Sequence, residues 1–242
     1  MLEAKNISKS YENTKVLKDV SLSIERGKIC ALIGPSGTGK TTLLKILAFL
    51  EQPDSGSVTI DGITYKYPLE KSQKVEAPWP KVTVVFQQLF LWPHLTLLQN
   101  ITLPLSARGL DDNPPRLQEL LKLFDMNHFV YRYPNQASIG QRQRAALVRA
   151  LLLNPEYLLL DEITSSLDIE QTAIILSQLK KLGSQGIGIL TITHLLQFAH
   201  EAADKVIFMA GGEIVEEGGP NILLTPKHER LSQFLSVLKT VS

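Results

Sequence analysis

Short apolar runs separated by turn residues fill the first third of the chain and predict β-strands. Arg26-Gly27 and Asp61-Gly62 are typical of the turns between them. Residues 63–81 are polar and contain Pro68, Pro78 and Pro80, so we expect an irregular connection there, with at most a short helix. The expected strands cover residues 2–8, 16–24, 29–33, 57–60 and 82–86.

A helical pattern replaces this strand pattern in residues 93–152. Leu117, Leu120, Leu121 and Phe124 fall on one helix face, and Leu147, Ala150 and Leu151 fall on another. We therefore expect a helical subdomain at 93–152, inserted between two strands of a core. The remaining expectations are strands at 157–162 and 187–193, a hairpin of 205–209 with 213–215, and a short amphipathic helix at 230–238. This alternation predicts an α/β fold.

Bulk properties narrow the class of protein. The 242 residues suit one large domain or two small ones, and a net charge of +1 gives no basic field for nucleic acid. The single cysteine, Cys30, cannot form an internal disulfide, which fits a reducing compartment. The N-terminus is too polar for a signal peptide, and no apolar run approaches the ~18 residues of a membrane span. Any membrane role would therefore need a separate partner chain.

The strongest motif runs from Gly34 to Thr41 and fits the phosphate-loop pattern G-x-x-x-x-G-K-[ST]. An apolar strand leads into it and a helical pattern leads out, which is the context that the chemistry needs. Glycines let backbone N–H groups surround phosphate oxygens, and the helix N-terminus adds partial positive charge. Lys40 would reach the β- and γ-phosphates, and the Thr41 hydroxyl would bind Mg²⁺. A chance glycine-rich turn is the alternative.

Polar residues follow three further predicted strands. Gln87 comes after the strand at 82–86, Asp161-Glu162 ends the apolar run from Tyr157, and His194 follows Thr193. Because ligands gather at the carboxyl ends of parallel strands, these groups could converge on one γ-phosphate. Asp161 could hold Mg²⁺, and Glu162 could orient and deprotonate a water. The alternatives are a solvated amide, a solvated acidic loop and a structural histidine.

Two other residues have ordinary interpretations when read alone. Tyr11 lies between the first two strands and suits a half-buried strand-end aromatic. Ser138, in the segment Ala137 to Gln141, suits the N-cap of the following helix.

Taken together, these residues resemble the ATP-binding subunit of an ABC transporter over nearly the whole chain. Gly34–Thr41 is similar to its Walker A motif, and Tyr157–Glu162 to its Walker B motif. Gln87 resembles the Q-loop, Ser165 to Asp168 the D-loop, and His194 the switch histidine. Tyr11 occupies the position where the family stacks an aromatic ring on adenine. A Walker A motif alone is shared by many NTPases, whereas this ordered set is specific.

The resemblance implies a P-loop NTPase (RecA-like) core, an N-terminal antiparallel β subdomain and an inserted helical subdomain. Residues 1–92 and 153–242 would form the core with the β subdomain, and residues 93–152 the helical part. It implies Glu162, His194 and Gln87 as catalytic residues, and Thr41, Gln87 and Asp161 as the Mg²⁺ site. The residues implied to bind ATP are Tyr11, Gly34, Pro35, Ser36, Gly37, Thr38, Gly39, Lys40, Thr41, Thr42, Ser138, Gly140, Gln141 and Asp168.

Two positions depart from the family pattern. The signature LSGGQ reads Ala137-Ser138-Ile139-Gly140-Gln141 here, so a β-branched residue replaces the first glycine. Because such a residue cannot adopt a positive φ cheaply, we expect an effect on the tightness or rate of dimer closure rather than on the fold. The position after Glu162 is commonly proline and is Ile163 here, for which we expect a minor effect.

The resemblance also implies partners. Two copies would enclose ATP head to tail, and transmembrane permease subunits would hold the dimer at the cytoplasmic face of the inner membrane. The stretch Phe86 to Thr96 is similar to importers of polar amino acids, in which a separate substrate-binding protein selects the cargo. The alternatives are an ABC ATPase of a non-importing machine, such as lipoprotein release, export or cell division, a soluble cassette acting on nucleic acid or ribosomes, and a cassette that does not hydrolyse ATP.

Overall fold

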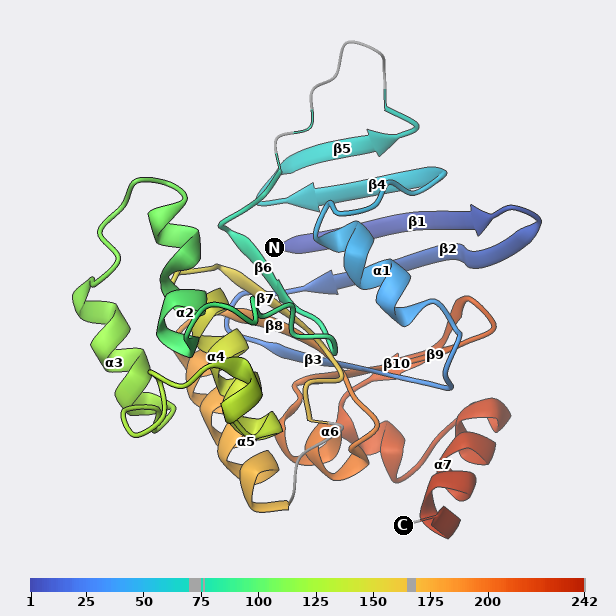
Figure 1. The fold of residues 1–242 in the computed structure, drawn as a ribbon. Helices are drawn as coiled ribbons and strands as arrows, with labels where there is room; N and C mark the ends of the chain where they lie inside the picture. The colour runs from blue at the N-terminus through green and yellow to red at the C-terminus, as the bar shows by residue number, and fades with distance from the viewer. Residues whose placement is uncertain (70–74, 76, 165–168, 242) are drawn as a thin grey trace.

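The computed structural model describes residues 1–69, 75, 77–164 and 169–241 and contains two β-sheets (Figure 1). The strands are β1 (Leu2–Tyr11), β2 (Thr14–Ile24), β3 (Ile29–Ile33), β4 (Ser55–Ile60), β5 (Ile63–Tyr67), β6 (Val82–Val85), β7 (Tyr157–Asp161), β8 (Gly188–Ile192), β9 (Lys205–Ala210) and β10 (Glu213–Gly218). The helices are α1 (Lys40–Leu47), α2 (Leu97–Ser106), α3 (Pro115–Leu123), α4 (Ile139–Leu151), α5 (Ile169–Ser184), α6 (Leu196–Ala202) and α7 (Glu229–Val241), with 3₁₀ turns η1 (Pro134–Gln136) and η2 (Pro220–Leu223).

The larger sheet is mainly parallel and forms the core of an α/β fold, as the sequence predicted. Its six strands have the order β10-β9-β3-β8-β7-β6, and only the β9–β10 hairpin is antiparallel. The central strands β3, β7 and β8 are buried along their whole length, which explains why they appear in the sequence as continuous apolar runs.

The smaller sheet is antiparallel, with the order β2-β1-β4-β5. Strand β5 corrects the sequence expectation, which placed residues 63–67 in an irregular connection. Its residues pair with β4 around the Asp61-Gly62 turn and show a mostly exposed pattern. The segment Ile63 to Tyr67 does alternate apolar and polar residues, so a strand signal was present, and the polar, proline-containing residues that follow it outweighed that signal.

Helix α1 packs between the two sheets. Its apolar residues Leu43, Leu44, Ile46 and Leu47 join side chains of β1, β2 and β4 in one hydrophobic cluster with one face of the central sheet. The opposite face of that sheet packs against α4, α5, α6 and α7. Alternate residues of β3 divide between the two clusters, because successive side chains of a strand point to opposite faces.

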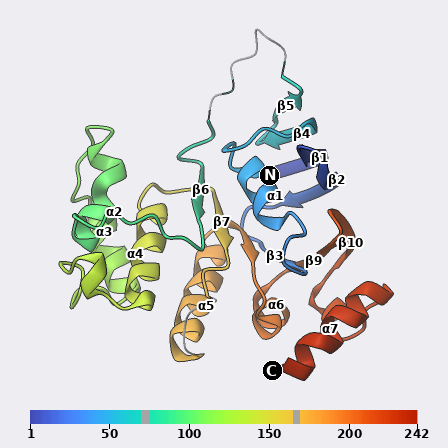
Figure 2. The same cartoon turned by 45° about the vertical axis from the view of Figure 1, so that its right-hand side comes forward.

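Helices α2, α3 and α4 occur between β6 and β7 and lie together beside the edge of the sheet at β6 (Figures 1 and 2). The residues predicted to share a helix face in α3, Leu117, Leu120 and Leu121, are buried there together with Phe124 at its C-cap. Helix α4 also supplies Ala145, Leu147, Val148 and Leu151 to the cluster under the central sheet. This helix therefore connects the group of helices with the sheet.

Candidate functional site

The order of the parallel strands brings four predicted groups together at the carboxyl ends of the strands. Strands β3, β8, β7 and β6 are neighbours and run in the same direction. The loop into α1 follows β3, His194 follows β8, Asp161 and Glu162 end β7, and Gln87 follows β6. Their sequence separations are large, so this convergence depends on the sheet order.

The loop after β3 has a backbone that only glycine accepts at two positions. Gly34 has φ 148°, and a Cβ atom there would lie 2.0 Å from the carbonyl oxygen of Met209. Gly39, the N-cap of α1, has φ 92°, and its Cβ atom would lie 2.7 Å from the Leu17 side chain. Gly37 also has a positive φ, 77°, but its Cβ atom would meet no atom within 4 Å. Close packing against neighbouring strands therefore determines the path of the loop.

The Lys40 side chain lies inside the curve of this loop. Its Nζ atom donates hydrogen bonds to the carbonyl oxygens of Gly34, at 2.8 Å, and Pro35, at 2.7 Å. Burial lowers the pKa of Lys40, and the negative charges of Glu162 and Asp161 act against that shift. The ammonium group is thus close enough to both carboxylates for their charges to act on it.

Thr41 and Asp161 form the next contact of the site. The Thr41 hydroxyl donates to Asp161 Oδ2 at 2.9 Å, and Asp161 is only 5% exposed. Burial raises the pKa of Asp161, against the Thr41 hydrogen bond and the Lys40 charge. A hydroxyl and a carboxylate held this close are oxygen ligands of the type that Mg²⁺ prefers, so these side chains fit a magnesium site.

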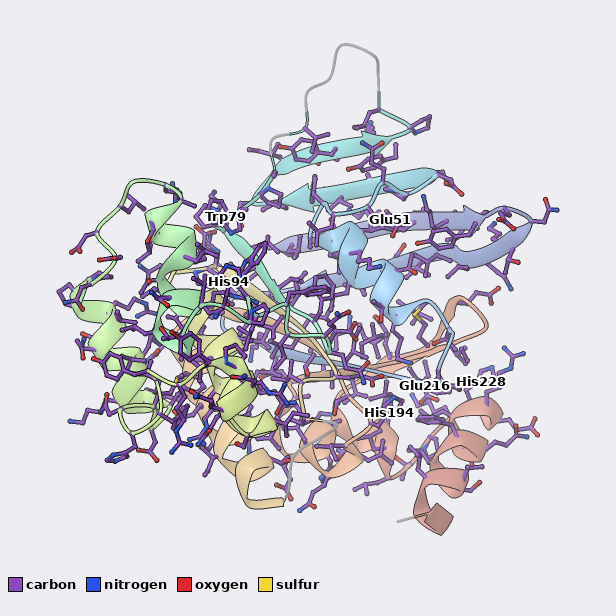
Figure 3. All side chains as sticks on the ribbon, in the orientation of Figure 1. Glu51, Trp79, His94, His194, Glu216 and His228 are labelled. Carbon is purple, nitrogen blue, oxygen red and sulfur yellow. The ribbon has the colours of Figure 1, made fainter. Side chains whose placement is uncertain are left out.

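Glu162 and His194 pair at the ends of β7 and β8. His194 Nε2 donates to Glu162 Oε1 at 2.9 Å. Glu162 has φ 49°, in the left-handed region that residues with a Cβ atom rarely adopt, and its N–H donates to the Ile192 carbonyl at 3.0 Å. Such strained residues concentrate at functional sites. Both side chains line a cavity of about 600 Å³ between α5 and α6, and Figure 3 shows His194 beside α6.

Gln87 stands apart from these contacts. It lies two residues beyond β6 and is exposed, and among the described residues it makes no hydrogen bond to Thr41 or Asp161. The structure places it after the carboxyl end of β6, without bringing its amide to the Thr41–Asp161 pair.

Tyr11 is the last residue of β1 and is 43% exposed. Its hydroxyl bonds to Glu51, and Lys9 Nζ lies 5.5 Å from the ring centroid. Burial and Glu51 raise the pKa of Tyr11, whereas a hydrogen bond with Thr42 of α1 lowers it. The ring is therefore anchored beside the helix that follows the phosphate loop. Sequence reasoning missed Lys9 and Glu51, because no local pattern connects a strand residue with one 40 positions away.

The segment from Ser138 to Gln141 lies at the start of α4, away from the strand ends (Figure 1). Ser138 is the N-cap: its Oγ accepts from the Gln141 N–H at 3.2 Å, and Gln141 Oε1 accepts from the Ser138 N–H at 3.1 Å. This capping box leaves Ile139 and Gly140 as the first residues of the helix.

The reason given for the Ile139 expectation does not hold, whereas the expected effect on dimer closure stays a prediction. Ile139 is the first residue of α4, and neither it nor Gly140 has a positive φ. A β-branched residue is therefore compatible with this backbone, and its side chain, 40% exposed, is the feature that differs from glycine. Ile163, the second departure, is buried in the hydrophobic cluster beneath the central sheet. Ser165 to Asp168, predicted to form the D-loop, lie outside the described residues.

No helix among the described residues is both long enough and apolar enough to span a membrane.

Comparisons with known proteins give the family of the chain. Residues 17–165 match the model of a family described as ABC transporter. The chain is 37% identical over 239 residues to the glutamine transport ATP-binding protein GlnQ of Escherichia coli (strain K12), with 97% of this chain and 98% of that protein covered. It is 38% identical over 241 residues to the L-cystine import ATP-binding protein TcyC of Bacillus subtilis (strain 168), with 98% of each covered.

A solved structure is also similar. It is described as a dimeric post-hydrolysis state of the ATP-binding cassette MJ0796 bound to ADP and phosphate. The TM-score is 0.79 and the identity 33%, with 91% of this chain and 99% of that chain covered. The likeness thus covers most of the chain.

Proposed function

Because the chain belongs to the ABC transporter family, we propose that it binds and hydrolyses ATP to drive a membrane transporter that imports polar amino acids. The observation that carries the proposal is the contact of His194 Nε2 with Glu162 Oε1, at 2.9 Å. This pair lies at the carboxyl ends of the strands, where Lys40 and the Thr41–Asp161 pair also lie. The carboxyl ends of these strands thus offer phosphate-binding groups, ligands for a cation and a carboxylate base.

The chain's own residues would divide the reaction as follows. Tyr11 would stack on adenine, and Lys40 with the N–H groups of the loop would hold the phosphates. Thr41 and Asp161 would hold Mg²⁺, which neutralises charge on the phosphate oxygens, and Gln87 would join them directly or through water. These contacts would position the γ-phosphate for attack.

Glu162 would orient the attacking water and accept its proton, a role that typically contributes ~10²–10⁴ in rate. His194, which donates to Glu162 here, would hold that carboxylate in place and stabilise charge on the γ-phosphate. The backbone of Glu162 supports this role, because its left-handed conformation and the bond from its N–H to Ile192 fix the point from which the side chain leaves the main chain.

The proposal includes a second copy of the chain. The MJ0796 cassette of known structure is dimeric, and by analogy the segment Ser138 to Gln141 of one copy would cover ATP held by the other. Transmembrane permease subunits at the cytoplasmic face of the inner membrane would receive the closure, through Gln87 and the helices that follow it. A substrate-binding protein would act only through the permease, and no nucleic acid is involved.

The cargo follows from kinship rather than from the site. Glutamine and cystine appear in the names of the relatives, and both are polar amino acids. Because the proposed site handles only ATP, the chains that bind cargo would select it.

A single substitution tests the proposal. Glu162→Gln keeps the shape of the side chain but removes the base, so ATP should accumulate in a closed dimer and turnover should fall at least about 100-fold. Size-exclusion chromatography with ATP and a phosphate-release assay measure the two effects. Glu201→Gln is the matched control, because Glu201 lines the same cavity but accepts a hydrogen bond from Gln197. Normal turnover by Glu162→Gln would contradict the role proposed for this residue.

A further inference from the structure

Arg149 of α4 holds the chain segment that follows Gln87. Its Nη1 atom donates to the carbonyl oxygen of Phe90 at 2.9 Å, and its Nη2 atom donates to that of Leu89 at 2.7 Å. The planar guanidinium thus binds two successive carbonyl groups, two and three residues after Gln87. The contact joins residues 59 and 60 positions apart in the sequence.

Arg149 is bound through main-chain carbonyl groups rather than through an ion pair. Among the described residues no carboxylate pairs with it, and burial alone lowers its pKa. Arg149 is partly buried, and a cation that loses part of its hydration is unfavourable unless hydrogen bonds compensate. Here the acceptors are the main-chain carbonyl groups of Leu89 and Phe90, so the contact fixes the position of that main chain.

The backbone at Phe90 needs such support. Phe90 has φ 47°, a left-handed conformation that is rare for a bulky residue. Its side chain is 59% exposed and touches Phe86 edge-on, with ring centroids 5.9 Å apart, so packing in the core does not hold it. The hydrogen bond from Arg149 to its carbonyl stabilises this turn directly.

Helix α4 carries a different functional segment at its other end. Ser138 caps the helix, and Ile139 and Arg149 are ten residues apart, or about 15 Å along the axis. Helix α4 is continuous from Ile139 to Leu151, so a displacement of its N-terminal end at Ser138 would carry Arg149 with it.

We propose that Arg149 is a positioning residue that fixes the segment after Gln87 to α4. As a result, the segment Ser138 to Gln141, which contacts the ATP of the second copy, moves together with Gln87, which lies beside the chain's own ATP. The inference rests on the proposed function, because it assigns Ser138 and Gln87 to two ATP sites of one dimer. Loss of the contact would leave ATP binding intact while uncoupling closure from catalysis.

The test compares Arg149→Lys with Arg144→Lys. Lysine keeps the charge but cannot hold two carbonyl groups in a planar fork. Arg144 is the matched control: it lies on the same helix, burial lowers its pKa, and its Nη1 donates to the carbonyls of Phe124 and Asp125 at 3.1 and 3.4 Å. The control thus loses a similar contact that is remote from Gln87.

For Arg149→Lys we expect kcat for ATP hydrolysis to fall about 10–100-fold, as for a misplaced catalytic group, with KM changed by less than about 2-fold. The Hill coefficient for ATP should fall towards 1, because the two sites would no longer be coupled. Arg144→Lys should keep the wild-type values of all three. Wild-type kinetics for Arg149→Lys, or the same losses in Arg144→Lys, would overturn the proposal.

A second readout does not depend on hydrolysis. Amide hydrogen exchange of residues 87–92 should accelerate about tenfold or more in Arg149→Lys and remain unchanged in Arg144→Lys. If the wild type hydrolyses no ATP but exchange follows this pattern, the proposed function fails while the positioning contact stands. If the wild type is active and exchange at 87–92 is the same in all three proteins, only the inference about Arg149 fails.

Discussion

Alanine substitutions at two glycines of the phosphate loop test whether close packing against a neighbouring strand requires glycine there. Gly34 and Gly37 both have a positive φ, 148° and 77°, so each substitution carries a conformational cost. Only at Gly34 would the added Cβ atom meet an obstacle, because it would lie 2.0 Å from the carbonyl oxygen of Met209. At Gly37 nothing lies within 4 Å of that atom.

The two costs differ in size. A residue with a Cβ atom in a left-handed conformation loses roughly 1–2 kcal/mol, and this is the whole expected effect of Gly37→Ala. Overpacking adds about 1–3 kcal/mol or more. Relief at Gly34 is difficult because Met209 belongs to β9, which pairs with β3, so the strands would have to separate. We expect Gly34→Ala to lower the free energy of unfolding by roughly 3 kcal/mol or more.

Thermal unfolding without nucleotide measures the difference. For a chain of this length 1 kcal/mol corresponds to about 2–4 °C, so Gly37→Ala should lower Tm by a few degrees and Gly34→Ala by about 6–12 °C. Both variants should be measured at one protein concentration, because association would shift Tm. A Gly34→Ala protein that melts within about 2 °C of Gly37→Ala would refute the argument that Met209 determines the residue at position 34.

Two further predictions concern the smaller sheet. Tyr11→Ala should weaken ATP binding by ~1–3 kcal/mol, the range for a base stacked on an aromatic ring, whereas Tyr11→Phe should retain most of the affinity. A calorimetric titration that gives equal affinities for the wild type and Tyr11→Ala would contradict the stacking role. Burial would raise the pKa of Asp61, but hydrogen bonds with the N-terminal ammonium, Tyr157 and other neighbours outweigh it and hold the pKa well below its usual range. The stability that Asp61 contributes is therefore present above about pH 4 and is lost as the pH falls towards the lower folded-state pKa. In urea unfolding, Asp61→Asn should lower the free energy of unfolding by about 1–3 kcal/mol at pH 7 and by progressively less below pH 4. An equal loss at pH 7 and at about pH 3 would show that the charge of the carboxylate is not responsible.

Helix α4 shows that a resemblance in sequence can be interpreted with a structural reason that does not hold. The order Ser138-Ile139-Gly140-Gln141 resembles the family signature apart from one residue, and we expected that residue to affect dimer closure because it avoids a positive φ. The capping box sets helical geometry from Ile139 onwards, and a β-branched side chain is compatible with it. What distinguishes this chain at position 139 is therefore an exposed apolar side chain rather than backbone strain.

The sequence by itself determined the elements whose signals are local. Continuous apolar runs gave β3, β7 and β8, the glycine spacing gave the loop before α1, and the residues after each strand gave the candidates Asp161, Glu162 and His194. Only the tertiary structure decided that these strands are neighbours, that β5 extends the small sheet, and that Arg149 reaches Leu89 and Phe90. The physical reason is that periodicity and turn chemistry act over a few residues, whereas strand order and side-chain contacts depend on how distant surfaces pack.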